Sequence, residues 1–487
     1  MEDACSMMQA SMRIVRWSNA SLHLAGAFTQ SHTHVARTHA QAGTATHTSS
    51  PTCFTTASWM VSSIHVSTAL TLMGAMLLWL LLWYVASPTT TKVARGTRES
   101  EAGMQHGTGP HSSARRSPKC RPKLATLNGM RLPAAFAIFL LHTGITMSKF
   151  YGIPQWLHYR FVLCLTYWVL TWFFMLSGFV FTYTYDDGRL DDPAANKVFF
   201  VRRLARIFPC YYIALGACLL LAPCTGNEAC LITYPLNSIF LQSWLPVSMC
   251  DGGYISAYGS TAAWFDSLLL VFSMMSAWLC RNLPRFAGVR ANVCLLIVIL
   301  VLRSVPTLTV ASYFMGSLDF QKWGLVRIWE YIAGMQLARL FNQCSAEVAT
   351  WRGWGWIFDG CVALALLWMV ALGGPQLVNS GDVGHTWLAG LVIFAAACAA
   401  DEDGMPSSGL LCRFFASGPL VKGAQWSHAF YVLNPPIRYA MPAAFWYLQG
   451  WAYKLPALFA ANLVAAIAVT HFENWFARRV DKRLKGT

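Results

Sequence analysis

Charged residues are scarce in this sequence. Only 12% of the 487 residues are charged, whereas soluble proteins carry about 25%. Hydrophobic residues make up 55% of the chain, and 21 residues are tryptophan. Tryptophan is enriched where membrane proteins meet the lipid headgroups. The composition therefore excludes an ordinary soluble domain and indicates a membrane protein with many spans.

The sequence also lacks the short-range patterns of metal sites. None of its 15 cysteines forms a CxxC pair or a Cys/His spacing typical of a metal site. Most lie within apolar runs, where a cysteine behaves as a small hydrophobic residue. Cys224, Cys230 and Cys250 share one polar loop and can form a disulfide if that loop faces an oxidising compartment. We therefore predict no metal cofactor.

Composition shifts divide the chain into five parts. Residues 1–66 are rich in Ser, Thr, Ala and His and are predicted to be disordered. Residues 67–87 form a run long enough for a first transmembrane helix, and the polar, basic residues 88–126 form a linker. A core at 127–472 and a basic tail at 473–487 follow. The core contains ten apolar segments near 132–148, 161–184, 207–223, 263–280, 292–310, 325–341, 357–373, 385–400, 428–448 and 455–471.

The distribution of basic residues predicts the topology. Residues 223–262 and 374–386 contain no Lys or Arg, while the alternate loops and the tail are basic. By the positive-inside rule, the linker and the C-terminus are cytosolic, and the N-terminus and residues 223–262 lie outside or in a lumen. The formal net charge of +15 is thus loop charge. No basic cluster is typical of nucleic-acid binding. We therefore predict that the protein does not bind nucleic acid and that membrane lipid is one of its partners.

The stretch from Leu127 to Ile145 places a cation and an imidazole in one apolar run. We expect its helix to begin near Leu132, with Arg131 just outside it at the membrane rim. On a continuous helix, the eleven steps from Arg131 to His142 bring the two residues to within about 20° of one face and about 16 Å apart along the axis. A titratable residue at this depth either faces the protein interior with a functional role or makes an interhelical hydrogen bond.

Ser177 and Gly178 form a notch of small residues within the aromatic segment FFMLSGFVFTY. Small residues allow two helices to approach closely, and this is the favoured interpretation. Contact with a bound ligand is the other interpretation.

Three arginines, Arg202, Arg203 and Arg206, stand at the predicted cytosolic start of the helix near 207–223. A helix N-terminus flanked by arginines is a good anion site, although such a cluster also serves as a topology signal. Arg131 is predicted at the same membrane face. Four cations at one rim, with His142 further inside, suit a phosphate-bearing donor whose reactive end reaches inward.

Two acidic residues are candidate partners of the histidine. Glu330 follows Arg327 by three residues and shares its helical face. It either orients His142 or pairs with Arg327, and the pair is favoured. Asp266 is a second, less favoured candidate for orienting His142.

Several short motifs occur in a fixed order along the core. They are LNGMR followed by His142, FFMLSGF, RRLARIFP followed by Tyr211, FLQSW (240–244), RIWEYIAGM (327–335) and WSHAFYVLNPP (426–436). In this order and spacing they resemble the membrane acyltransferase-3 family, over about residues 125–472. The resemblance implies an all-α, ten-helix membrane core, here with one extra N-terminal transmembrane helix.

The same resemblance implies a function. It predicts an acyltransferase that moves a group other than an aminoacyl group from acyl-CoA, bound on the cytosolic side, to a hydroxyl acceptor such as a carbohydrate or lipid-linked compound. His142 matches the family's essential base and Arg131 its signature arginine. Arg202, Arg203 and Arg206 match its arginine-rich motif.

The sequence departs from the family pattern at four positions. Asn128 stands where the family usually has Asp, Pro133 where it has a small residue, and Asn434 where a histidine is common; Asp266 lies near the position of a glutamate. These departures concern the acceptor side. A catalytically inactive membrane scaffold is therefore one alternative function. A proton-coupled secondary transporter is another, since His, Glu and Asp within membrane segments also mark proton relays.

Overall fold

The computed structural model describes residues 121–151, 155–221, 234–244, 262–286, 288–309, 323–348, 351–371, 378–444 and 451–486. These residues are mostly helical and contain no β-strand. The predicted disordered segment, the first transmembrane helix, the linker before residue 121 and the loop with the three cysteines lie outside the described residues.

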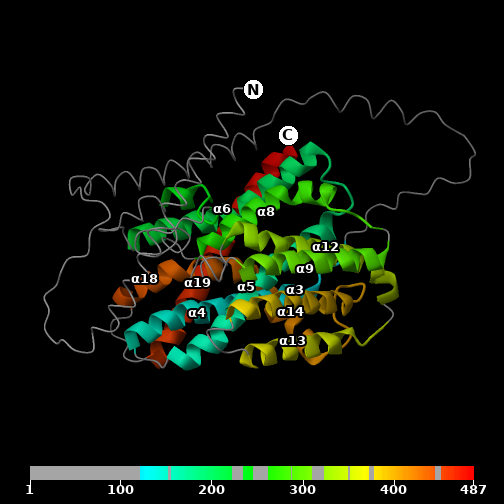
Figure 1. The fold of residues 1–487 in the computed structure, drawn as a ribbon. Helices are drawn as coiled ribbons and strands as arrows, with labels where there is room; N and C mark the ends of the chain where they lie inside the picture. Colours follow the sequence, from blue (N-terminus) through cyan, green and yellow to red (C-terminus); the bar gives the residue numbers. More distant parts are fainter. Residues whose placement is uncertain are drawn as a thin grey trace, which may run out of the picture. The chain divides into compact units, whose positions relative to one another are not determined.

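The described helices follow one another along the core (Figure 1). In chain order they are α3 (Ala125–Gly129), α4 (Arg131–Tyr151), α5 (Gln155–Tyr185), α6 (Pro193–Leu221), α8 (Ala263–Asn282), α9 (Val289–Thr309), α12 (Gly324–Val348), α13 (Trp354–Ala371), α14 (Val378–Cys398), α15 (Leu410–Phe415), α16 (Gly418–Gly423), α17 (Ser427–Val432), α18 (Asn434–Ala444) and α19 (Trp451–Gly486). A 3₁₀ turn at Ala424–Trp426 joins α16 to α17.

Four described helices are long and apolar enough to cross a membrane. They are Cys164–Tyr185 in α5, Pro193–Leu221, Ala263–Asn282 and Tyr453–Lys485 in α19. Two shorter apolar helices are Trp354–Val370 and His385–Cys398. The ten-helix count and the extra N-terminal helix stay predictions.

The start of α6 differs from the prediction. The apolar run at 207–223 is only the second half of this helix, which begins at Pro193. The Asp192 carboxylate accepts hydrogen bonds from the backbone N–H groups of Ala194 and Ala195, at 3.1 and 3.3 Å. A capping aspartate followed by a proline in the first turn is a strong helix start. The basic stretch before the apolar run is therefore helical as well.

The segment predicted at 428–448 is divided into α17 and α18. Pro435 and Pro436 have no backbone N–H, so a helix arriving from α17 cannot continue through them. They are well placed in the first turn of a new helix, and α18 begins one residue earlier, at Asn434. By contrast, the residues predicted as a separate tail from 473 onward continue α19 without a break.

Helices α5 and α12 make the most extensive helix–helix contact in the described part of the core. A Cβ atom added at Gly178 would lie 2.0 Å from the carbonyl oxygen of Tyr331, and one added at Gly334 would lie 1.9 Å from that of Met175. The two glycines thus allow the backbones to touch on both sides of the contact. They place the polar residues of α12 against α5.

The FLQSW segment holds the first turn of α8 in place. The side-chain amide of Gln242 donates to the carbonyl oxygen of Ala263 at 2.9 Å, and the hydroxyl of Ser243 donates to that of Trp264 at 3.0 Å. Carbonyl groups of a first helical turn also accept the helix's own hydrogen bonds, so these side chains add contacts that attach the FLQSW segment to the start of α8. The same turn carries Asp266, whose position is set by these contacts.

Candidate active site

Helix α4 carries Arg131 and His142 without interruption. The helix begins at Arg131, one residue before the predicted start, and Pro133 is its third residue, where the missing N–H has no intrahelical acceptor to lose. The continuous helix supports the calculated separation of about 16 Å along one face. Asn128 lies in the preceding short helix α3, and its side chain is 3.5 Å from the carbonyl oxygen of Val421.

The arginine-rich motif does not stand at a helix N-terminus. Since α6 starts at Pro193, Arg202, Arg203 and Arg206 lie in its interior, where backbone N–H groups bond to carbonyl oxygens of the preceding turn. The prediction that a helix N-terminus supports anion binding by these arginines is therefore wrong. Any anion binding at this position depends on the guanidinium groups themselves.

The three arginines of α6 have different surroundings. Arg202 is exposed and its Nε atom pairs with Asp481 of α19 at 2.6 Å. Arg203 is half-buried and close enough to Arg131 of α4 and to Arg206 for their positive charges to repel one another. Within the described residues, no carboxylate pairs with Arg131, Arg203 or Arg206. The structure thus brings unneutralised cations from two helices together and leaves Arg202 out of the group.

The Ser177–Gly178 notch is part of the helix packing. Gly178 faces the backbone of α12, and the Ser177 hydroxyl donates to the carbonyl oxygen of Phe173 at 2.7 Å within α5. These contacts fit the packing interpretation of the motif. The alternative, contact with a bound donor, stays a prediction.

Glu330 lies in a fully buried ion-pair cluster. Its Oε1 atom pairs with Arg327 at 2.6 Å and with Arg303 of α9 at 2.8 Å, and it accepts a hydrogen bond from Thr171 of α5 at 3.2 Å. The favoured pair with Arg327 is therefore present, together with a second arginine. One carboxylate holds two buried guanidinium groups, so the cluster joins α5, α9 and α12.

His142 is half-buried and has a cation beside its backbone. The Nη1 atom of Arg438, on α18, donates to the carbonyl oxygen of His142 at 2.9 Å. Arg438 was not predicted as a site residue, although a charged residue inside the apolar segment 428–448 is a functional signal in a membrane protein. The contact places a positive charge close to the histidine.

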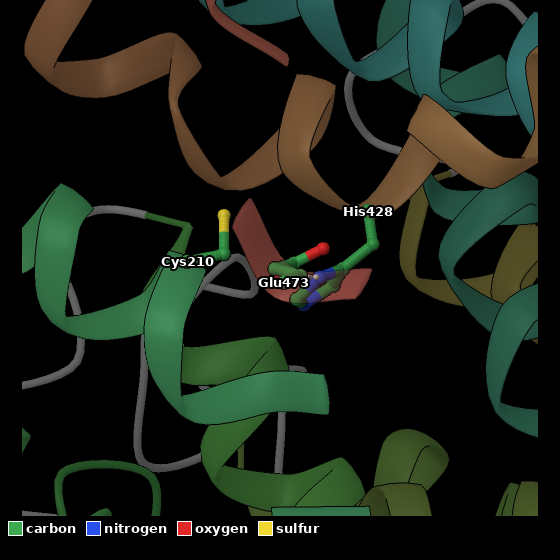
Figure 2. A group of neighbouring side chains, drawn as sticks. All are labelled: Cys210, His428 and Glu473. Carbon is green, nitrogen blue, oxygen red and sulfur yellow. Dashed lines mark ion pairs between the residues drawn. The ribbon is translucent and has the colours of Figure 1, made fainter. Parts of the chain in front are cut away.

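Asp266, which was a candidate for orienting His142, contacts His428 instead. The carboxylate is fully buried, and its Oδ1 atom lies 3.1 Å from Nε2 of His428 on α17. The other ring nitrogen of His428 faces Glu473 of α19, in the group drawn in Figure 2. His428 belongs to the WSHAFYVLNPP motif. Its position within an apolar run is the sequence feature that could have identified it as a candidate site residue. Glu473 lies in the segment predicted as the basic tail, and no sequence feature there indicates a site residue.

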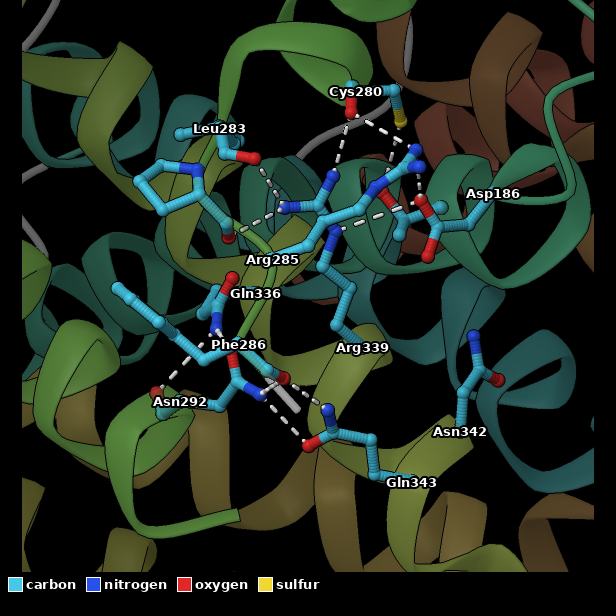
Figure 3. Close-up of polar contacts among 12 residues, drawn as sticks. Asp186, Cys280, Leu283, Arg285, Phe286, Asn292, Gln336, Arg339, Asn342 and Gln343 are labelled. Atoms are coloured by element: carbon cyan, nitrogen blue, oxygen red, sulfur yellow. Dashed lines mark hydrogen bonds and ion pairs between the residues drawn. The ribbon is translucent and has the colours of Figure 1, made fainter. Parts of the chain in front are cut away.

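A separate polar cluster ties the α8–α9 connection to α12 (Figure 3). Arg339 of α12 donates to the carbonyl oxygens of Cys280 and Leu283 at 2.8 and 3.2 Å, and its Nε lies 3.5 Å from Asp186. Arg285 also pairs with Asp186, at 3.1 Å. The hydrogen bonds from Arg339 end on backbone carbonyl groups at the end of α8, so the cluster stabilises the connection.

The comparison with protein families agrees with the motifs. The family model described as Acyl_transf_3, acyltransferase domain, matches residues 124–471, which include every helix from α4 to α18 and the larger part of α19. No curated protein and no solved structure matches the chain. Together with the four apolar helices, the match indicates an integral membrane protein. Because the match covers well over half of its length, the chain belongs to the acyltransferase-3 family.

Proposed function

We propose that this protein is a membrane acyltransferase that moves an acyl group from acyl-CoA to a hydroxyl acceptor, such as a carbohydrate or lipid-linked compound. Family membership supports acyl transfer in general. The observation that carries the choice of donor is the convergence of Arg131 and Arg203, two like charges without a carboxylate partner in the described residues. A bound anion would neutralise these two charges, and arginine binds phosphate with two parallel hydrogen bonds.

The proposed donor lies along α4. Its phosphates bind Arg131, Arg203 and Arg206, and its pantetheine arm extends about three turns along the helix to His142. We propose that this end of the helix is cytosolic, in keeping with the basic loops, because acyl-CoA is available there. Arg202 contributes little, since Asp481 already neutralises its charge.

The proposed chemistry uses His142 as a general base. A neutral imidazole takes the proton of the acceptor hydroxyl as the oxygen attacks the thioester carbonyl carbon. The carbon–sulfur bond then breaks, the ester forms, and the protonated His142 gives its proton to the departing sulfur, so that coenzyme A leaves as a thiol and the imidazole is neutral again. The guanidinium group of Arg438, which donates to the backbone carbonyl of His142, is suitably charged to stabilise the developing oxyanion.

The proposal is tested with purified protein in detergent, using acyl-CoA and a panel of hydroxyl acceptors. Release of free coenzyme A is the readout. We expect His142→Ala to lower the rate by about 10²- to 10⁴-fold, the usual contribution of a general base, while His471→Ala, a change at an exposed histidine of α19, leaves it unchanged. Wild-type turnover in the His142 variant would show that this histidine is structural. Absence of thioester cleavage with every acceptor would instead favour a transporter or an inactive scaffold.

A further inference from the structure

Three donor atoms of different chemistry meet between α6, α17 and α19. They are Sγ of Cys210, a ring nitrogen of His428 and a carboxylate oxygen of Glu473, and all lie within 4.8 Å of one another. Figure 2 shows the three side chains converging from their separate helices. Cys210 is fully buried and Glu473 is 8% exposed. The sequence did not predict this group, because its members are more than 200 residues apart.

Contacts between the three side chains leave polar atoms unsatisfied. Nδ1 of His428 lies 3.6 Å from Oε1 of Glu473, which is beyond hydrogen-bonding distance. Oε1 is buried and has no hydrogen-bond partner. A buried carboxylate oxygen that has only this long contact with an imidazole and no hydrogen bond is costly. A bound cation between the two atoms would remove this cost.

Asp266 completes an arrangement that is typical of metal centres. Its Oδ1 atom lies 3.1 Å from Nε2 of His428. Histidines that bind metals almost always have their second ring nitrogen bonded to a carboxylate or carbonyl group, which orients the ring. Because Asp266 engages Nε2, the nitrogen left to face Cys210 and Glu473 is Nδ1.

We propose that Cys210, His428 and Glu473 bind a divalent transition-metal ion of the zinc class, with Asp266 as the outer partner of His428. Zinc bonds of about 2.0–2.3 Å place tetrahedral ligand atoms roughly 3.3–3.8 Å apart. The 3.6 Å between His428 and Glu473 fits this range, and the Cys210 thiol would have to move closer to them. Mixed sulfur, nitrogen and oxygen ligands suit zinc better than magnesium or calcium. Binding releases the thiol proton of Cys210, since the thiolate is the ligand.

The site adds to the proposed acyl transfer and does not depend on it. Three protein ligands leave a fourth position for water or another oxygen ligand, as in catalytic rather than structural zinc sites. Along α6, Cys210 lies seven residues beyond Arg203, which is about 10 Å further on and on nearly the same face. The proposed metal site therefore lies on α6 about 10 Å from Arg203, one of the arginines that are proposed to bind the donor.

The test measures metal content directly. Full-length protein purified in detergent without chelators is analysed by mass spectrometry for bound metals, then stripped and reloaded with Co²⁺. We expect about one zinc ion per chain and, after reloading, the near-ultraviolet absorption band of a thiolate–cobalt bond. Cys210→Ser should abolish the band and weaken zinc binding by more than about 100-fold. Asp266→Asn should weaken it by about 10- to 100-fold, as expected for an outer partner.

Cys218→Ser is the matched control, because Cys218 is also a buried cysteine of α6. It should keep the zinc, the cobalt band and the elution volume of the native protein. Glu473→Gln is a second ligand variant in case Cys210→Ser does not fold. Native protein that neither retains zinc nor binds Co²⁺ would overturn the proposal, and so would an unchanged cobalt band in Cys210→Ser.

Discussion

Neighbouring arginines of α6 should differ sharply in their effect on coenzyme A binding. Arg203 lies near Arg131 with no carboxylate partner among the described residues, whereas Arg202 is 48% exposed and paired with Asp481. Losing one charge-assisted hydrogen bond costs about 1.5–3 kcal/mol. At about 1.4 kcal/mol per tenfold, Arg203→Ala should raise the Kd for coenzyme A by roughly 10- to 150-fold. Arg202→Ala alters an exposed ion pair and should change the Kd by less than about threefold.

The assay is titration calorimetry of coenzyme A into purified protein at two salt concentrations. Arg203→Lys should recover only part of the affinity, because lysine acts as a point charge. Higher salt should weaken binding to the native protein more than to Arg203→Ala. Thermal stability provides a second readout, in which Arg203→Ala should not show the loss that it shows in coenzyme A affinity. Removing one of two repelling charges should leave the melting temperature of Arg203→Ala unchanged or raise it.

Two results would refute this reasoning. Native affinity in a correctly folded Arg203→Ala variant would place the phosphates elsewhere. Equal losses in Arg202→Ala and Arg203→Ala would mean that overall positive charge, rather than the pair with Arg131, governs binding. The arginine-rich motif would then be a topology signal.

Three further predictions concern stability and topology. Glu330→Gln should lower the free energy of unfolding by about 3–5 kcal/mol, because it removes the buried negative charge that Arg303 and Arg327 share; denaturation in detergent measures this, and a loss below about 1 kcal/mol would contradict it. Gly178→Ala should destabilise by about 1–3 kcal/mol, since its Cβ would overlap a carbonyl group of α12, whereas Gly216→Ala, in open space on α6, should be neutral or stabilising. A tag at the C-terminus should be digested by protease added to the cytosolic side of sealed vesicles, and a protected tag would reverse the proposed topology.

Local sequence determined most helix positions. Apolar segments from 132 onward coincide with helices, because hydrophobic length and helical hydrogen bonding are properties of contiguous residues. The relation between Arg131 and His142 followed for the same reason, since both lie on one helix. The start of α6 was also readable, because Asp192 and Pro193 form a helix-start signal. The apolar run at 207–223 covers only the second half of this helix and so does not mark its start.

Tertiary structure alone decided which side chains meet. Hydropathy and spacing place Arg202 and Arg203 in the same motif, but the packing of α6 against α19 directs Arg202 toward Asp481. Glu330 could be paired with Arg327 from their spacing, whereas the second arginine comes from another helix, α9. A contact between helices depends on how they rotate and cross, and this is set by packing over their whole length.

The group around His428 is the clearest case of this difference. Its acidic partners come from α8 and α19, and its neighbouring thiol comes from α6. No fixed spacing links these residues, so a search for local metal motifs had to miss them. The sequence alone determined a helical membrane protein of the acyltransferase-3 type with a histidine and an arginine on one helix. The folded core decided which charges are neutralised and where the thiol, imidazole and carboxylate of Cys210, His428 and Glu473 meet. Both depend on distances between residues that the chain brings together only when its helices pack.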